Sequence, residues 1–299
     1  MALQSSAMAG YVTVVTDSTA CLPTDMAARW GISIVQQQLH VGDHLDDEAR
    51  IAPQTLLDAF ADGTPLSTSP PDPGAFFWTY QDAIARGASA VVSLHISGKL
   101  SKTTDMAKFG AADSRVPVHV VDTGTAGMSL GYAVLAAARI ANAGGNVDQV
   151  INAARGRMTS SVELIHVETL EYLRRGGRIG AAAHLIGSAF SVKPLLTVQN
   201  GEIVPLSRTM GSDRAVRKLV DTAVAKAGSA PVDIAIEHFG ADRRIDYILE
   251  QLKRRVPNLN QVNVVGVSAI IMVHVGPGGI GITISPAENV PARPRSFMS

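Results

Sequence analysis

Residues 90–112 read AVVSLHISGKLSKTTDMAKFGAA and contain an apolar run, a small polar cluster and a segment with helical spacing. The run Ala90–Ile96 is almost continuously apolar, which is typical of a strand buried on both faces of a parallel sheet. Leu100–Ala112 has apolar residues at the spacing of an amphipathic helix. A strand that leads through a polar turn into a helix is the repeating unit of layered α/β domains.

The same unit recurs through the first half of the chain. Further strands are expected at Tyr11–Val15, Ile32–Leu39 and Val118–Val121, and further helices at Gln54–Ala61, Gly74–Ala85 and Leu130–Ala141. This alternation predicts an N-terminal α/β domain over residues 11–160, with a mainly parallel sheet and right-handed crossovers.

The pattern changes after residue 160. A strand (Ser161–Val167) and two helical segments (Thr169–Arg175 and Ala181–Ala189) precede a hairpin, because Asn200-Gly201 separates two extended runs, Pro194–Val198 and Glu202–Leu206. The remaining elements are expected at Ser212–Ala227 (helix), Val232–Phe239 (strand), Asp242–Arg255 (helix), Val262–Ile271 (strand) and Ile280–Ile284 (strand). We therefore predict a smaller α/β domain with a mixed sheet over residues 161–286, and a ligand cleft between the domains.

Composition excludes several classes of function. The 299 residues carry 26 basic and 26 acidic side chains and only 5% aromatic residues, so neither charge nor stacking favours nucleic acid or an anionic membrane surface. Cys21 is the only cysteine, which leaves no internal disulfide or thiolate metal centre and favours a reducing cytoplasm. The longest apolar stretch, Val264–Val275, falls short of the ~18 to 20 residues of a membrane span. We expect a soluble cytoplasmic protein with no metal and no integral membrane association.

Two catalytic patterns match by their letters but not by their context. Gly127–Gly131 fits G-x-S-x-G, yet Ser129 lies well beyond the strand that would have to precede a nucleophile elbow. Gly276–Gly281 fits G-x-G-x-x-G, but a strand-like segment follows it where a dinucleotide site needs a helix. Neither a phosphate-binding P-loop nor an H-E-x-x-H zinc motif occurs.

Small polar clusters are the remaining signal, each at the end of an expected strand. They begin at Thr16, Thr68, Ser97, Asp122 and His274. Ligands of open α/β sheets bind at the carboxyl ends of the strands, and hydroxyls with helix-start N–H groups suit an anionic oxygen. The residues themselves thus indicate an anion-binding α/β protein.

The order of these clusters resembles the DegV family from about Tyr11 to Ile284. The most specific stretch is Thr169–Ile179, which reads TLEYLRRGGRI. The other matching motifs are Val15–Pro23, Thr68-Ser69-Pro70 with Gly74 and Phe76, Leu100-Ser101 with Thr103, Lys193-Pro194-Leu195, and His274 with Gly276-Pro277-Gly278.

The resemblance implies a two-domain DegV-like (EDD) fold and a carrier function. A bacterial protein of this kind binds one long-chain fatty acid, such as palmitate, stearate or oleate, and presents it to a fatty-acid kinase catalytic subunit. It has no catalytic residue or cofactor of its own and is a monomer or weak dimer. By position, the carboxylate ligands would be Thr68, Ser69, Ser97, Gly98 and His274. The supporting or partner-facing residues would be Asp17, Ser18, Ser101, Arg178 and Gly276.

The chain departs from the family pattern near the proposed head group. Gly98 stands where a second serine is usual, Pro71 replaces a glutamine, and Lys99 and Lys102 replace glycines. We expect both lysines to be solvated, with pairing to a carboxylate or acyl phosphate as the other possibility. Two other functions remain open: a serine-dependent acyl hydrolase or transferase, using Ser129 or Ser97 with His274, and a lipid-responsive regulatory scaffold.

Overall fold

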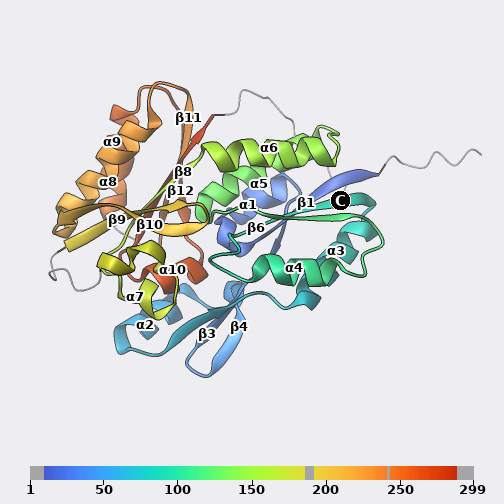
Figure 1. Cartoon of the computed structure of the whole chain (residues 1–299), viewed down its shortest axis with the longest axis horizontal. Helices are drawn as coiled ribbons and strands as arrows, with labels where there is room; N and C mark the ends of the chain where they lie inside the picture. Colours follow the sequence, from blue (N-terminus) through green and yellow to red (C-terminus); the bar gives the residue numbers. More distant parts are fainter. Residues whose placement is uncertain (1–9, 186–191, 241–242, 288–299) are drawn as a thin grey trace, which may run out of the picture.

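The computed structural model describes residues 10–185, 192–240 and 243–287. Its N-terminal half contains a four-stranded sheet in the order β2-β1-β6-β7, in which every pair is parallel (Figure 1). The strands are β1 (Tyr11–Asp17), β2 (Ser33–Val35), β6 (Ala88–His95) and β7 (Val118–Asp122). The predicted parallel α/β sheet is confirmed.

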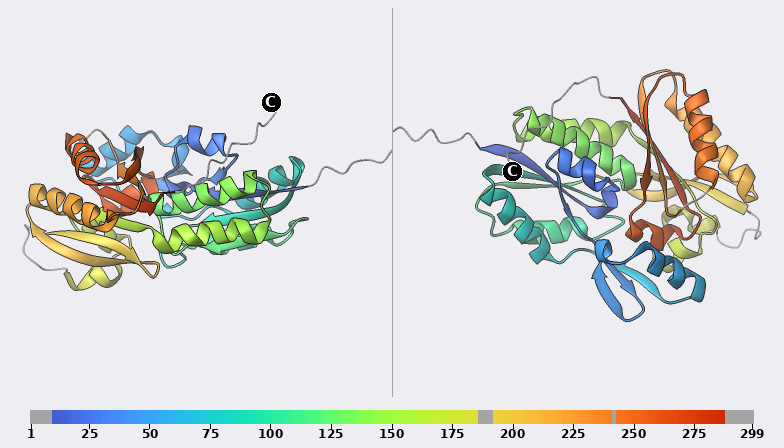
Figure 2. Two further views of the ribbon diagram at one scale, coloured as in Figure 1. Left: turned by 90° about the horizontal axis from the view of Figure 1, so that it is seen from above. Right: turned by 180° about the vertical axis from the view of Figure 1, so that it is seen from behind.

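Helices cover both faces of this sheet (Figure 2). The pair α3 (Pro73–Ala85) and α4 (Thr103–Ala111) packs on one face, with Val15 and Val91 of the sheet in their core. On the other face, α5 (Gly127–Asn142) and α6 (Val147–Ser160) pack against Val14 and Val92. The short helix α1 (Thr24–Arg29) lies beside β2.

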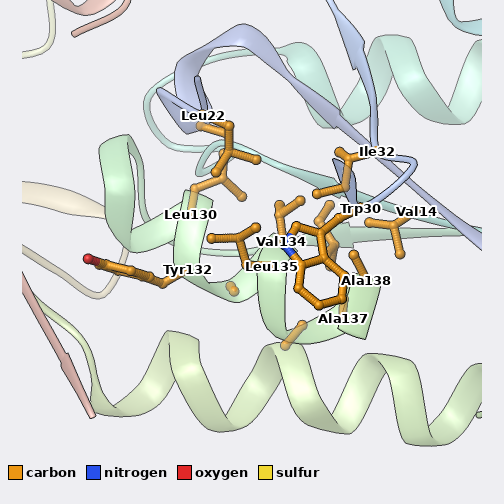
Figure 3. Close-up of a cluster of buried hydrophobic side chains, with 14 of the residues drawn as sticks. Val14, Leu22, Trp30, Ile32, Leu130, Tyr132, Val134, Leu135, Ala137 and Ala138 are labelled. Atoms are coloured by element: carbon orange, nitrogen blue, oxygen red, sulfur yellow. The ribbon is translucent and has the colours of Figure 1, made fainter. Parts of the chain in front are cut away.

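Helix α5 is the centre of the largest hydrophobic core. Thirteen of its 16 residues are buried, because it is enclosed by the sheet, α6 and the C-terminal half. Trp30 and Ile32 pack against Val134 and Ala138 on one side of the helix (Figure 3). A helix that is apolar almost all round is expected only where it is enclosed on every side.

The C-terminal half contains a six-stranded mixed sheet in the order β10-β9-β8-β13-β11-β12. Only β11 and β12 are parallel; the other neighbours are antiparallel. The predicted hairpin is confirmed as β9–β10, and α8 has the predicted bounds. The elements are β8 (Val162–His166), β9 (Val192–Gln199), β10 (Glu202–Met210), α8 (Ser212–Ala227), β11 (Val232–His238), α9 (Arg243–Arg255), β12 (Leu259–Gly266) and β13 (Ile280–Pro286). Helices α8 and α9 bury the apolar face of this sheet.

The prediction of one strand over Ile32–Leu39 is wrong. The chain leaves the parallel sheet after Val35 and starts β3 (Gln38–Val41), which joins β4 (His44–Asp47) and β5 (Leu66–Ser69) in a small antiparallel sheet. Gln37 fixes the chain between β2 and β3, because its side-chain amide donates to Asp17 Oδ1 (3.2 Å) and Thr103 Oγ1 (2.8 Å). The helix α2 (Pro53–Asp62) lies in the connection from β4 to β5.

The strand expected over Val262–Ile271 also ends early. After β12 the chain forms helix α10 (Ala269–Val275), so the cluster at His274 follows a helix and not a strand. Ser268 caps this helix, and the Glu48 carboxylate accepts from the Ser268 hydroxyl (2.7 Å) and from Ile270 N–H (3.1 Å). A cap supplied from 220 residues away has no local sequence signal.

Thr169–Arg175 contains helix α7 (Glu171–Arg175), and Gly180–Leu185 is a 3-10 helix; the rest of the expected helix to Ala189, and Asp242, lie outside the described residues. The domain boundary at residue 160 stays a prediction. Among the helices described, none has the length and apolar character required to cross a membrane.

Candidate functional site

An apolar cavity lies where the two halves of the chain meet. Its walls come from the loops after β6 and β7, from the mixed sheet and from α10. The aliphatic residues that line it are Ile96, Leu100, Ile165, Leu173, Val198, Ile203, Val267, Ile270, Ile271, Val275 and Ile280. Such a lining suits a hydrocarbon chain, because each buried methylene contributes about 0.8 kcal/mol.

A group of polar residues forms one mouth of this cavity. Thr68 Oγ1 lies 2.9 Å from His274 Nε2, and Ser69 Oγ lies 2.8 Å from His40 Nε2. Thr68, His274 and Arg178 line the apolar cavity and also a second, outer hollow. A head group bound at this mouth can therefore be reached from the outer side.

His274 is uncharged in this setting. Burial, together with the nearby Arg178 guanidinium, lowers the pKa of His274 to about 4. Gly176 lies against the ring, since a Cβ on Gly176 would be 2.2 Å from His274 Nδ1. Nδ1 is buried and makes no hydrogen bond to the residues that the structure describes. Only Nε2 is therefore available for a polar contact, and that contact is Thr68.

Arg178 ties the two sides of the mouth together. Its Nε donates to the Leu100 carbonyl (2.9 Å) and its Nη1 to the Gly176 carbonyl (2.6 Å). These bonds join the loop before α4 to the end of α7. Ser101 also lines the cavity, and its hydroxyl lies 2.8 Å from Thr103 Oγ1. The structure therefore brings Thr68, Ser69, Ser101, Arg178 and His274 to one cavity.

Ser97 and Gly98 lie outside that lining. The Ser97 hydroxyl donates to the Gly201 carbonyl (2.8 Å) and accepts from Lys99 N–H (3.2 Å), while Gly98 N–H donates to Asp122 Oδ2 (3.1 Å). Ser97 is thus bonded to the turn of the β9–β10 hairpin. Its role as a carboxylate ligand stays a prediction.

Asp17 and Ser18 belong to a hydrogen-bond network that includes Gln37, a residue of the cavity lining. Asp17 accepts from Ile96 N–H (3.1 Å) and lies 3.0 Å from His95 Nδ1, and Ser18 Oγ accepts from Gln37 N–H (3.1 Å). Burial alone would raise the pKa of Asp17, but these hydrogen bonds, led by that of His95, lower it overall. Asp17 therefore fixes the loop after β6 as an ionised anchor.

Gly276 is a packing position. Its φ is +80°, and a Cβ there would lie 2.1 Å from the Tyr172 ring. Both observations require glycine. The residue brings the end of α10 against α7.

The two lysines near the proposed head group are exposed. Lys99 Nζ pairs with Glu202 Oε1 at 3.0 Å and Lys102 Nζ with Asp105 Oδ2 at 3.9 Å. Their side chains are 56% and 75% exposed, which matches solvated surface residues.

The serine nucleophiles considered from the sequence are not beside His274. Ser97 is bonded to Gly201, and Ser129 is buried within α5. A Ser93–His95–Asp17 chain does occur, with His95 Nε2 2.7 Å from Ser93 Oγ. All three residues are 0% exposed, so no substrate reaches this serine in the folded protein.

Two residues of the cavity were missed by the sequence analysis. Glu163 of β8 and Glu237 of β11 line the cavity, although they are only 6% and 3% exposed. Both lie in largely apolar strands, Glu237 together with Asp233 on β11, and no spacing connects two acids 74 positions apart. No group of three or more residues able to hold a metal ion occurs in the described ranges.

Comparison with known proteins gives matches over nearly the whole chain. A family model described as an uncharacterised protein of the DegV family matches residues 11–287. A DegV domain-containing protein of Streptomyces coelicolor is 43% identical over 279 residues, which cover 93% of this chain and 99% of that protein.

Two solved structures are similar at 29% identity. One is a fatty-acid-binding DegV family protein from Thermus thermophilus, with a TM-score of 0.87 and coverage of 93% of this chain and 100% of that one. The other is a DegV family protein from Corynebacterium glutamicum, with a TM-score of 0.79 and coverage of 94% and 98%. The fold described above is that of these relatives.

Proposed function

The chain belongs to the DegV family, and from that membership we propose that it binds one long-chain fatty acid, such as palmitate, stearate or oleate. The acyl chain occupies the apolar cavity and the carboxylate lies at Thr68 and His274. The observation that carries the proposal is the combination of an aliphatic lining with a hydrogen-bonded Thr68–His274 pair at its mouth. The fatty acid bound by the Thermus thermophilus relative supports it.

The neutral His274 imidazole determines which hydrogen-bond donor faces a bound carboxylate. With its hydrogen on Nε2, His274 donates to Thr68 Oγ1, and the Thr68 hydrogen is then free to point at a carboxylate oxygen. Ser69 and the Arg178 guanidinium line the same cavity and add a hydroxyl and a positive charge. The hydrocarbon supplies most of the affinity, and these polar groups fix the orientation.

The protein presents the carboxylate of the bound fatty acid to a separate fatty-acid kinase subunit and does not itself catalyse a reaction. Support comes from the shared position of Thr68, Arg178 and His274 between the cavity and the outer hollow, which leaves the head group reachable by a partner. Tyr172 and Arg175 of α7 line the outer hollow and form part of the surface that a partner would meet.

Native mass spectrometry of the purified protein, followed by organic extraction, tests the binding proposal. We expect one fatty acid per chain, and an affinity about tenfold lower in Thr68→Ala and His274→Ala, because a hydrogen bond to a charged group contributes roughly 1.5–3 kcal/mol. Ser67→Ala is the matched control: it removes a hydroxyl from the next position of β5, which lines only the outer hollow and not the cavity. A protein that stays free of lipid after incubation with palmitate, stearate and oleate contradicts the proposal.

A further inference from the structure

The cavity has a polar pair away from its mouth. Glu163, Thr283 and Glu237 stand on one face of the mixed sheet, because Thr283 is the register partner of Glu163 and Gly281 that of Glu237. Glu163 and Glu237 line the cavity but not the outer hollow. They therefore lie apart from the Thr68–His274 mouth, among groups that a hydrocarbon tail would meet.

Hydrogen counting shows that this pair holds a proton. The Thr283 hydroxyl contacts both Glu163 Oε2 and Glu237 Oε1, the latter at 2.8 Å. A hydroxyl has a single hydrogen and can donate to only one of the two. The other carboxyl must therefore donate to Thr283 and must be protonated.

The helix start identifies which acid is protonated. Met128 N–H, in the first turn of α5, donates to Glu237 Oε2 at 3.0 Å, and the positive end of a helix favours an ionised carboxylate. Burial raises the pKa of both acids, but the adjacent Glu237 raises that of Glu163 further, whereas the Thr283 and Met128 hydrogen bonds lower that of Glu237. The arrangement is therefore a neutral Glu163 that donates to Thr283, which donates to an ionised Glu237.

One acceptor remains unused. Both oxygens of Glu237 already accept hydrogen bonds, whereas Glu163 Oε1 makes none with the residues that the structure describes. Gly281 lies close beside this oxygen: a Cβ on that glycine would be only 3.3 Å from Oε1, so any side chain there would crowd it. Ser129, 2% exposed, approaches Glu163 without completing a hydrogen bond. The tail end of the cavity thus offers an unpaired acceptor that a methyl group cannot satisfy.

We propose that the cavity selects a fatty acid that carries a hydroxyl group in the distal half of its chain, which donates to Glu163 Oε1. The inference rests on the proposed fatty-acid binding and names the class of acyl chain. A cationic tail does not fit, because the only ionised partner, Glu237, has both oxygens occupied. A plain chain would leave a buried acceptor without its hydrogen bond, which is unfavourable.

Binding of stearate and of a series of hydroxystearates to the lipid-free full-length protein tests this. We expect at least one acid with a distal hydroxyl to bind tenfold or more tightly than stearate, and acids with a hydroxyl near the carboxylate to gain nothing. If every hydroxystearate binds no better than stearate, the selectivity is wrong while fatty-acid binding stands. If neither stearate nor any hydroxystearate binds, the proposed function itself is wrong.

Two variants at one position separate the hydrogen bond from the shape. Glu163→Gln keeps an acceptor oxygen and a donor to Thr283 in the shape of the neutral acid, so the preference should persist. Glu163→Leu removes the acceptor. The ratio of the affinity for the preferred hydroxystearate to the affinity for stearate should then fall to within about twofold of one, while stearate still binds. A preference unchanged in Glu163→Leu, or lost in Glu163→Gln with stearate binding intact, overturns the proposal. If the leucine variant does not fold, the ratio of hydroxystearate to stearate affinity in the wild type and in Glu163→Gln still tests the proposed selectivity.

Discussion

Single residues at the two ends of the cavity are kept neutral by burial. His274 at the mouth loses its proton because burial lowers its pKa to about 4, and Glu163 at the tail end keeps its proton because burial and Glu237 raise its pKa. The same physical cause acts with opposite sign on a base and an acid. The only ionised group of the tail-end pair is Glu237, which the start of α5 stabilises.

Stability should therefore depend on pH through Glu163. A carboxyl whose folded pKa is raised gives stability that is fully present below its ordinary value of 4.5 and is lost as pH rises through the folded pKa. Glu163→Gln keeps the bonds of the neutral acid at every pH. We expect the midpoint of thermal unfolding of this variant to rise relative to wild type between pH 5 and pH 8. The other titratable groups beside the pair are Cys21 and Tyr132.

Glu168 provides the control of opposite sign. A hydrogen bond from His166, followed by those from Lys193 and Ser212, holds the pKa of Glu168 far below its usual range. The contribution of Glu168 to folding stability is present above its ordinary pKa of 4.5 and is lost as the pH falls. Glu168→Gln should therefore destabilise more at pH 7 than at pH 4, and two variants with the same pH trend would contradict this assignment.

Among the elements, helix α10 links the fold to the site. It is only seven residues long, yet it carries Ile270, Ile271 and His274 to the cavity. Its start is fixed by Ser268 and by Glu48, which reaches it from the small-sheet region. The position of the imidazole thus depends on a contact between distant parts of the chain.

Ser268→Ala should lower stability by about 1 kcal/mol, the usual cost of a lost N-cap, and should also weaken fatty-acid binding. Asn146→Ala removes the capping box of α6, which carries no residue of the cavity. It should cost similar stability and leave affinity unchanged. Urea unfolding and a binding titration on both variants make the comparison; equal losses of affinity would show that general destabilisation is responsible.

Local pattern was sufficient for some elements and insufficient for others. The β9–β10 hairpin and α8 follow from Asn200-Gly201 and from helical spacing, which are properties of neighbouring residues. The break at Gln37 and the start of α10 depend on partners 66 and 220 positions away, so no window of sequence contains them. Glu163 and Glu237 were missed for the same reason, since their shared proton exists only when the strands pair.

Across the whole molecule, the two halves meet through polar contacts as well as through the core. Arg157 of α6 donates to Asp233 of β11 at 3.2 Å, with side-chain exposures of 8% and 3%. Ser161 and Ser285 lie 2.7 Å apart on the same face of the sheet. Because Asp233, Thr283 and Glu237 share that face, a row of buried polar groups runs along the junction.

Asp233→Ala should destabilise the protein by about 3–5 kcal/mol, because it leaves the buried Arg157 charge without this carboxylate. Asp221→Ala is the control: it breaks the Arg255–Asp221 pair, which is shorter at 2.8 Å but has a 56% exposed carboxylate, and should cost about 0–1 kcal/mol. Guanidinium unfolding of both variants measures the difference. Equal losses of unfolding free energy in the two variants would mean that the junction is as solvated as the surface.

The Thr68–His274 contact joins residues 206 positions apart. During synthesis, the threonine leaves the ribosome long before the histidine has been added. A nascent chain therefore has half of its head-group site and no wall from α10, and cannot hold a ligand as the finished protein does. Under the proposed function, lipid can load only onto chains whose translation has passed α10, and the occupied state would then mark a chain that has been synthesised through α10.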